Sequence, residues 1–198
     1  MMSPVPIAVS PDRPDLLAVL AERILTDAGA ARPVVIVDGG SGSGKTTLAN
    51  RLAGELEAAS GSAWQLVHDD FYPGWLGLSA AWTVIPEQIL AAHDPGYRMW
   101  DWQADAPGER RLLDPDEPVL VEACGALTPA SAALATTTIW IEVDVATRRR
   151  RALARDGEMF APWWALWAVQ EELHRVRHRP QDLADVRIVF GSAQVLST

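Results

Sequence analysis

The sequence predicts an α/β fold in which a mostly parallel sheet carries helices on both faces. Short apolar runs alternate along the chain with longer segments of helical periodicity, and the first run, VVIVD at 34–38, has no polar interruption before its final aspartate. Such runs are typical of strands buried on both faces. Strands that alternate with helices form parallel sheets through right-handed crossovers. With 198 residues, the chain suits one domain over 1–198 with a small lid.

The expected elements follow this alternation from the N-terminus. Leucine and isoleucine at helical spacing predict a helix over 14–29, and the strand at 34–38 leads through a glycine-rich turn into a helix over 45–59. Further strands are expected at 64–67, 119–121, 138–143 and 186–190, and further helices at 146–156 and 162–177. Five prolines make 72–117 the least regular part, with one short helix expected at 86–92.

The composition argues against several classes of protein. A net charge of −9 disfavours general nucleic-acid binding, which needs a basic surface to displace counterions. The one cysteine, Cys124, rules out an internal disulfide framework and fits a reducing compartment. No apolar run approaches the length of a bilayer span, and residues 1–15 lack the pattern of a signal peptide. We therefore expect a cytoplasmic protein whose partners include neither nucleic acid nor membrane.

Residues 39–46, GGSGSGKT, match the phosphate-binding pattern G-x-x-x-x-G-K-[ST] and are called the P-loop below. The motif follows a predicted buried strand and opens a predicted helix, where backbone N–H groups and the helix N-terminus can surround a polyphosphate. This predicts an α/β domain of the P-loop NTPase type, a three-layer sandwich with a small helical lid at about 146–160. The residues expected to bind ATP here are Gly39, Gly40, Ser41, Gly42, Ser43, Gly44, Lys45, Thr46 and Thr47.

Lys45 distinguishes this motif from an ordinary turn between a strand and a helix. It is the only lysine, because the other 16 of the 17 basic side chains are arginine. A glycine-rich turn alone would explain the glycines but not this lysine, which provides a flexible point charge for the outer phosphates. Thr46 offers its hydroxyl to Mg²⁺, so ATP and Mg²⁺ are the expected cofactors.

Two carboxylates are expected at the same edge of the sheet as the P-loop. Asp69 follows the strand at 64–67 and Glu122 follows the strand at 119–121. The carboxyl ends of parallel strands form the ligand-binding edge of an open α/β sheet. Phosphoryl transfer requires a metal, carboxylates to hold it and cations over the phosphates. The alternatives are that Asp69 and Asp70 merely end a strand in a turn and that Glu122 caps the next segment.

Three stretches together resemble the uridine–cytidine kinase family: the P-loop, HDDFY at 68–72, and the arginine-rich segment from Asp144 to Asp156. Nicotinamide riboside kinases are close relatives of this family. The resemblance implies that Asp69 is the catalytic base and helps to hold Mg²⁺, with Glu122 and Thr46 completing the metal shell. It also implies that Lys45 and two lid arginines, Arg155 and Arg151, contact the phosphates. Lys45 and Arg155 are expected to be catalytic.

The same resemblance implies an acceptor site, which Asp69, Tyr72, Trp100 and Asp101 are expected to line. Trp100 and Asp101 lie roughly where the family has Tyr-Asp, whereas residues 75–86 have no carboxylate in place of the acidic residue that reads ribose in the family. The expected activity is therefore ATP- and Mg²⁺-dependent phosphorylation of a hydroxyl on a small molecule, with a nucleoside or nucleoside-like compound as the leading candidate. A non-catalytic nucleotide-binding module or regulatory ATPase, and a nucleotide kinase, are the alternatives.

Other conspicuous residues have simpler interpretations. The four consecutive arginines at 148–151 point all round a helix, so most of them are expected to face solvent. His174 and His178 share a helix face, but without a third ligand we expect a surface helix and no metal site. The tryptophans at 163, 164 and 167 are expected to anchor their helix to the domain.

Overall fold

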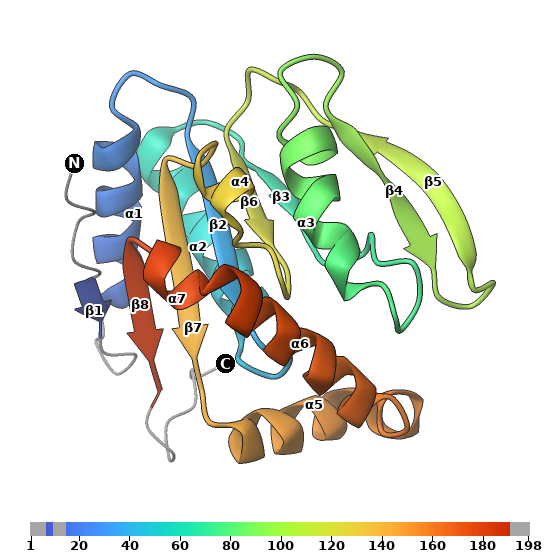
Figure 1. The fold of residues 1–198 in the computed structure, drawn as a ribbon. Coiled ribbons are helices and arrows are strands. Elements are labelled where there is room, and N and C mark those ends of the chain that lie inside the picture. The colour runs from blue at the N-terminus through green and yellow to red at the C-terminus, as the bar shows by residue number, and fades with distance from the viewer. Residues whose placement is uncertain (1–6, 10–14, 191–198) are drawn as a thin grey trace.

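The computed structural model describes residues 7–9 and 15–190, and a six-stranded parallel sheet forms its centre (Figure 1). The strand order is β1-β8-β7-β2-β6-β3, and every neighbouring pair in it is parallel. The strands are β1 (Ile7–Val9), β2 (Val34–Gly39), β3 (Gln65–Val67), β6 (Val119–Glu122), β7 (Thr137–Glu142) and β8 (Val186–Val189). β1 is too short to produce a recognisable pattern and was not predicted.

Helices cover both faces of the sheet, as the sequence predicts. On one face lie α1 (Leu16–Ala28) and α2 (Lys45–Ser60), and on the other lies α6 (Trp164–His178). Alternate residues of β2 belong to the two separate apolar clusters: Val35 and Val37 pack with α1 and α2, while Val34 and Ile36 pack in the cluster that contains α6. Because β2 is buried on both faces, its run carries no polar residue before Asp38.

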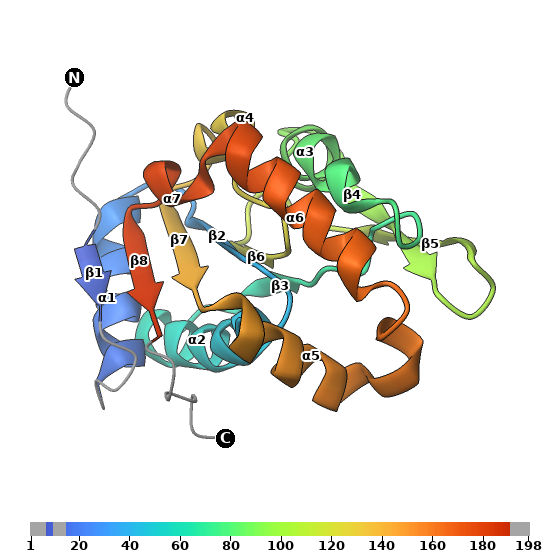
Figure 2. The same cartoon turned by 60° about the horizontal axis from the view of Figure 1, so that its bottom comes forward.

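The carboxyl ends of the strands meet at one edge of the sheet, which Figure 2 brings toward the viewer. The loop from β2 to α2 lies at this edge. So does the turn from β7 into α5 (Val145–Phe160), where the Asp144 side chain accepts a hydrogen bond from the backbone N–H of Thr147 at 2.9 Å and caps the helix. α5 extends four residues beyond the expected helix end, with non-helical backbone at Gly157, where φ is +54°.

The segment between β3 and β6 differs most from its prediction. Instead of one helix over 86–92, three short helical pieces run from 78 to 89: a 3₁₀ turn (Leu78–Ala80), α3 (Ala81–Val84) and a π-helical turn (Ile85–Ile89). An unpredicted antiparallel hairpin follows, formed by β4 (Gly96–Asp101) and β5 (Ala106–Leu112). β5 contains proline, glycine and three charged residues, so neither apolar alternation nor β-propensity indicates a strand there.

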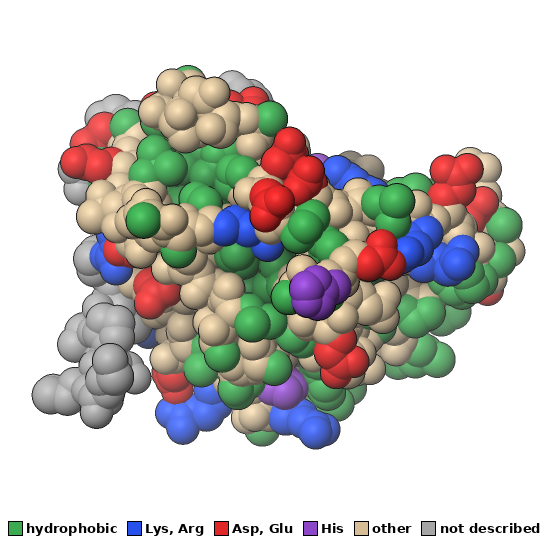
Figure 3. Space-filling view, turned by 90° about the horizontal axis from the view of Figure 1, so that it is seen from above, with side chains coloured by type: hydrophobic (Ala, Val, Ile, Leu, Met, Phe, Trp, Pro, Cys, Tyr) green, Lys and Arg blue, Asp and Glu red, His purple; other side chains and the backbone are tan. Residues whose placement is uncertain are grey.

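Two further short helices are α4 (Pro129–Ala132) and α7 (Pro180–Leu183), which are too short for periodicity to indicate. Figure 3 shows the end of the molecule where the parallel strands begin, and acidic and basic side chains are interspersed there. Within 7–9 and 15–190, no helix has both the length and the apolar character needed to cross a membrane.

Candidate active site: a phosphate loop beside an aromatic pocket

The P-loop curls tightly between β2 and α2. The backbone N–H of Ser43 bonds the carbonyl of Gly40 at 3.1 Å, and Gly44 takes φ of +96°, a left-handed conformation that favours glycine. α2 begins at Lys45, so the unpaired N–H groups of its first turn face the loop. The nine ATP-binding residues predicted from the motif therefore form one strand end, one loop and one helix start.

Lys45 is only 5% exposed and reaches across the loop. Its Nζ donates to the Sγ of Cys124 at 3.1 Å and to the carbonyl of Gly40 at 3.4 Å. Burial lowers the pKa of Lys45, but the negative charges of Glu122 and Asp69 and the hydrogen bond to Cys124 raise it overall. For Cys124, burial raises the pKa of the thiol. At neutral pH the thiol is therefore protonated, and its sulfur accepts the hydrogen bond from Lys45. Lys45 thus keeps its positive charge inside the site.

Glu122, at the end of β6, is fully buried beside the first turn of α2. Its Oε1 accepts a hydrogen bond from the Thr46 hydroxyl at 2.9 Å and lies 2.9 Å from Nδ1 of His68. Its Oε2 is buried without a hydrogen-bond partner in the structure. A buried carboxylate oxygen that lacks a partner is suited to bind a cation, so Thr46 and Glu122 fit the hydroxyl and carboxylate of a Mg²⁺ site.

Asp69 follows β3 and lies in the same electrostatic environment as Glu122. Burial, and then the charge of Glu122, raise the pKa of Asp69 to about 6, while Lys45 and Arg155 oppose this shift. A cation beside the two carboxylates would relieve the repulsion that Glu122 exerts on a charged Asp69. No group of three or more histidine, cysteine or acidic side chains with metal-binding geometry occurs among the described residues. Mg²⁺ needs fewer protein ligands because it keeps several waters.

Two cavities meet at Asp69. One, of about 50 Å³, is lined by Asp69, Arg155, Thr47 and five P-loop residues: Ser41, Gly42, Gly44, Lys45 and Thr46. The other, of about 210 Å³, is lined by Asp69, Arg155 and a set of mostly aromatic side chains: Tyr72, Trp75, Trp102, Phe160 and Trp167. Asp69 therefore borders both the phosphate loop and the aromatic pocket, which is the position that a base between nucleotide and acceptor requires.

The aromatic pocket is built by stacking between segments that are distant in sequence. Trp75 stacks on Phe160, with ring centroids 5.3 Å apart and planes at 16°, and on Trp163 at 5.9 Å and 8°. Trp102, at the tip of the β4–β5 hairpin, lies 4.7 Å from Trp75. The Tyr72 hydroxyl donates to the carbonyl of Cys124 at 2.6 Å, which fixes one wall against the loop after β6. Of these residues, Phe160 and Trp167 were not among those predicted to bind the acceptor.

The other two predicted acceptor residues have local structural contacts. The backbone N–H of Trp100 donates to the carbonyl of Asp70 at 2.7 Å, which ties the hairpin to the segment after β3. The Asp101 carboxylate is exposed and accepts the backbone N–H groups of Gln103 and Ala104 at 2.9 and 3.0 Å. Neither residue is among those that line the 210 Å³ pocket, so their substrate role stays a prediction.

The three arginines of interest on α5 occupy different places. Arg155 lines both cavities and pairs with its neighbour Asp156 at 2.7 Å, whereas the guanidinium of Arg151 lies over the Phe190 ring at 5.9 Å. Arg148, which we expected to face solvent, instead donates to the carbonyl of Ser41 in the P-loop at 3.1 Å. Arg148 and Arg155 are seven residues apart and so share a helix face, a spacing that could have indicated this role.

A buried polar network supports the start of the P-loop. Asp38, at the end of β2, accepts backbone N–H groups from Gly39, Gly125 and Leu127 at 2.6, 3.0 and 2.8 Å. Its Oδ2 also lies 2.9 Å from Nε2 of His174. α6 is a surface helix, with Val169 and Val176 exposed, but His174 is 2% exposed and lies on its buried face. The aspartate at the end of an apolar strand is the sequence signal for this network.

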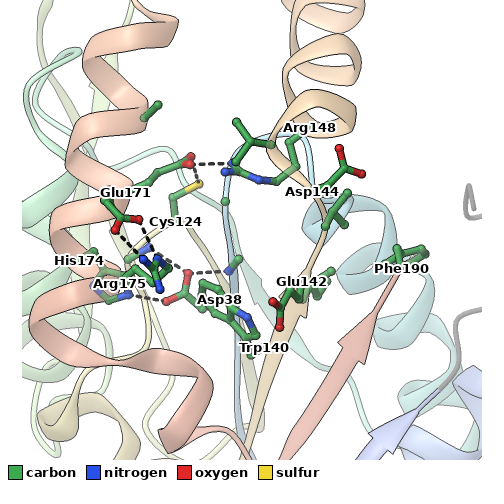
Figure 4. Close-up of a pocket in the computed structure, with 18 of the residues that line it drawn as sticks. Asp38, Cys124, Trp140, Glu142, Asp144, Arg148, Glu171, His174, Arg175 and Phe190 are labelled. Carbon is green, nitrogen blue, oxygen red and sulfur yellow. Dashed lines mark hydrogen bonds and ion pairs between the residues drawn. The ribbon is translucent and has the colours of Figure 1, made fainter. Parts of the chain in front are cut away.

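A larger cavity of about 580 Å³ lies on the other side of the P-loop start, between α6 and the ends of β7 and β8 (Figure 4). Its walls include the Asp38–His174 pair, the side chains of Arg148 and Glu171, and the rings of Trp140 and Phe190. The P-loop residues Gly39 and Gly40 therefore border this cavity too.

Comparison with solved structures finds proteins of similar fold. A protein described as a possible uridine kinase from Bacillus stearothermophilus superposes over 88% of this chain and 97% of its own, with a TM-score of 0.63 and 20% identity. One provisionally described as a fructose transport system kinase from Silicibacter sp. TM1040 superposes over 86% and 98%, with a TM-score of 0.53 and 21% identity. The chain has the P-loop kinase fold. No family model and no curated protein sequence matches it.

Proposed function

We propose that the protein is a kinase that transfers the γ-phosphoryl group of ATP to a hydroxyl of a small molecule, with Mg²⁺ as cofactor. The observation that carries this proposal is the position of Asp69, which borders both the P-loop cavity and a separate aromatic pocket. A nucleotide-binding module that only senses or hydrolyses ATP has no need of a second pocket beside the base. The P-loop kinase fold supports the same assignment.

In the proposed reaction, Asp69 takes the proton of the acceptor hydroxyl as its oxygen bonds to the γ-phosphorus. The bond from that phosphorus to the β–γ bridging oxygen breaks, and ADP leaves with the electron pair. The raised pKa of Asp69, about 6, lies close to neutral pH, which suits a general base. Lys45 and Arg155 would neutralise charge on the phosphates, and Arg151 is a further candidate on the same helix. When bound by Thr46, Asp69 and Glu122, Mg²⁺ would supply charge neutralisation between the phosphates.

The aromatic pocket favours a flat acceptor such as a nucleoside or a nucleoside-like compound. Trp75, Trp102, Tyr72 and Trp167 offer ring faces and edges, and the pocket volume of about 210 Å³ is suited to one small molecule. Carboxylates among the residues around it are confined to Asp69 and Asp156. This supports recognition by stacking rather than by an acidic residue that reads a ribose. ATP and this acceptor are the partners that we propose.

A screen of nucleosides, nucleoside analogues and other aromatic alcohols for ATP-dependent phosphorylation tests the proposal. At least one acceptor should be phosphorylated, and Asp69→Asn should reduce that rate at least about 10³-fold while nucleotide affinity changes little. The control is Asp70→Asn, which makes the same chemical change at the neighbouring position. If the wild-type protein only hydrolyses ATP slowly, whatever acceptor is present, the module hypothesis is favoured instead.

A further inference from the structure

The P-loop is in contact with an anion that belongs to the protein itself. The Glu171 carboxylate, on α6, accepts a hydrogen bond from the backbone N–H of Ser41 through Oε1 at 2.6 Å. Its Oε2 accepts from Nη1 of Arg148 at 2.7 Å, and that nitrogen also donates to the Ser41 carbonyl at 3.1 Å. Figure 4 shows the pair meeting beside Cys124. Both polar groups of the Ser41 backbone are therefore occupied by one Arg–Glu ion pair.

Two glycines of the P-loop make this contact possible. A Cβ atom at Gly40 would lie 2.1 Å from Nη1 of Arg148 and 2.8 Å from Oε2 of Glu171. At Gly42, where φ is +78°, a Cβ atom would lie 2.2 Å from the backbone carbonyl oxygen of Arg148. These glycines therefore leave room for α5 and the ion pair as well as for a phosphate.

The Glu171–Arg148 ion pair is much less exposed than a neighbouring ion pair on α6. Glu172 and Arg175 are 2.6 Å apart, and their side chains are 55% and 51% exposed. The side chains of Glu171 and Arg148 are only 10% and 12% exposed. Taking a charge pair out of water is costly, and such a pair is weak evidence for a stabilising role. Its position on a phosphate-binding backbone suggests a role in ligand binding.

We propose that Glu171 sets the affinity of the phosphate site by standing in for a phosphate oxygen at the Ser41 amide. This inference rests on the proposed function, because it requires that a polyphosphate binds the P-loop. One N–H group cannot donate a full hydrogen bond to two anions, and two anions this close repel each other. Nucleotide binding therefore displaces the Glu171 carboxylate, and the freed donors of Arg148 turn to the phosphates.

Whether the Glu171→Gln substitution raises or lowers the affinity for polyphosphate distinguishes this role from a structural one. Glu171→Gln keeps the size and can still accept the Ser41 N–H, but it removes the charge that competes with phosphate. Affinity for inorganic tripolyphosphate and for a non-hydrolysable ATP analogue, measured by calorimetry with Mg²⁺, should rise about tenfold, which corresponds to about 1.4 kcal/mol. If Glu171 merely holds α6 against the loop, the same variant should bind more weakly and unfold at a lower temperature.

Glu172→Gln is the matched control, because it removes one negative charge from the next residue of the same helix and should leave the affinity unchanged. Arg148→Gln should weaken tripolyphosphate binding, because it removes the guanidinium that turns to the phosphates once the Glu171 carboxylate is displaced. Equal gains in Glu171→Gln and Glu172→Gln would show a general charge effect and overturn the proposal. So would affinity in Glu171→Gln that is equal to or below that of the wild type.

A measurement without nucleotide separates this inference from the proposed function. The Ser41 amide proton should move upfield in the NMR spectrum of Glu171→Gln, because its hydrogen bond to a charged acceptor is lost, and should not move in Glu172→Gln. An unmoved resonance overturns the inference even if the wild-type protein phosphorylates acceptors. If neither the wild type nor Glu171→Gln binds any polyphosphate, the proposed function and the inference both fail.

Discussion

The two sides of the candidate active site are built in opposite ways. The phosphate side consists of one continuous segment, the P-loop and the first turn of α2, together with Glu122 and its hydrogen bonds to Thr46 and His68. The acceptor side is assembled from residues 69–75, the hairpin tip at Trp102 and residues 155–167, and it is held by ring stacking. Polar groups at fixed sequence spacing form the phosphate side, and the packing of aromatic rings forms the acceptor side.

The phosphate side is common to proteins with a P-loop, whereas the acceptor side is particular to this protein. Binding a polyphosphate makes the same geometric demand in any protein of this fold, so few sequences satisfy it. Stacking tolerates exchange of one aromatic ring for another and of one contributing segment for another. A pocket built by stacking can therefore change its ligand more easily than a phosphate loop can.

On the phosphate side, the largest expected effect comes from Lys45. Lys45→Met keeps the buried volume but removes the cation that contacts Gly40 and Cys124. We expect ATP turnover to fall about 10²–10³-fold, as when a preorganised charge is removed from an active site. Arg51→Met, on the solvent side of α2, is the control. A folded Lys45→Met protein with unchanged ATP affinity and turnover would contradict the phosphate assignment.

Asp69 stands between the two sides, and its burial has a cost in stability. Its pKa is raised from 3.8 to about 6 in the folded state, so the folded protein binds the proton more tightly than the unfolded chain does. The free energy of unfolding therefore falls as the pH rises from about 4 to 6, and above 6 the full cost is present. At pH 8 without divalent cations, Asp69→Asn should stabilise the protein by about 1–3 kcal/mol.

Urea unfolding at two pH values checks this prediction. The gain in Asp69→Asn should be mostly lost at pH 4 and should disappear near pH 3, where the wild-type carboxyl is largely protonated in both states. The gain should also shrink when Mg²⁺ is added at pH 8, because the metal relieves the repulsion that the substitution removes. A variant that is less stable than the wild type at pH 8 would mean that Asp69 is held by favourable bonds, and would weaken its assignment as a base.

The acceptor side should respond to loss of an aromatic ring without a change in nucleotide binding. Trp75→Ala removes the ring that stacks on Phe160 and contacts Trp102, so KM for the acceptor should rise about tenfold. KM for ATP should stay the same. Trp163→Ala is the control, because Trp163 also stacks on Trp75 but is not among the pocket-lining residues. Equal effects on both KM values would mean that the two sides are not separable.

The same contrast explains what the sequence could predict. The strands β2, β6 and β7 and the helices α1 and α2 follow from apolar runs and helical periodicity, and the P-loop follows from its motif. The β4–β5 hairpin could not be predicted, because its strands are charged and stabilised by contacts such as Tyr97 against Phe71, with ring centroids 5.8 Å apart. Arg148 and Glu171 meet on the P-loop although 23 residues separate them. No local pattern encodes that meeting.

The smallest expected effect concerns His68, whose ring lies beside Glu122. Its Nδ1 is 2.9 Å from the Oε1 that also accepts the Thr46 hydroxyl, and this hydrogen bond raises the pKa of His68. The bond fixes one oxygen of Glu122 and leaves Oε2 available to a cation. Groups that orient a metal ligand affect metal affinity even though they do not touch the metal.

His68→Ala should therefore weaken Mn²⁺ binding, measured by electron paramagnetic resonance, by about threefold to tenfold. The effect should be at or below the low end of the range for such residues, about tenfold, because the His68 side chain is 35% exposed and water can replace part of the hydrogen bond. In His68→Asn, the amide nitrogen can take the place of Nδ1, so this variant should recover most of the affinity. If both variants bind Mn²⁺ as the wild type does, Glu122 is held by Thr46 alone. If both lose the affinity equally, the ring itself is needed and the hydrogen bond is not the cause.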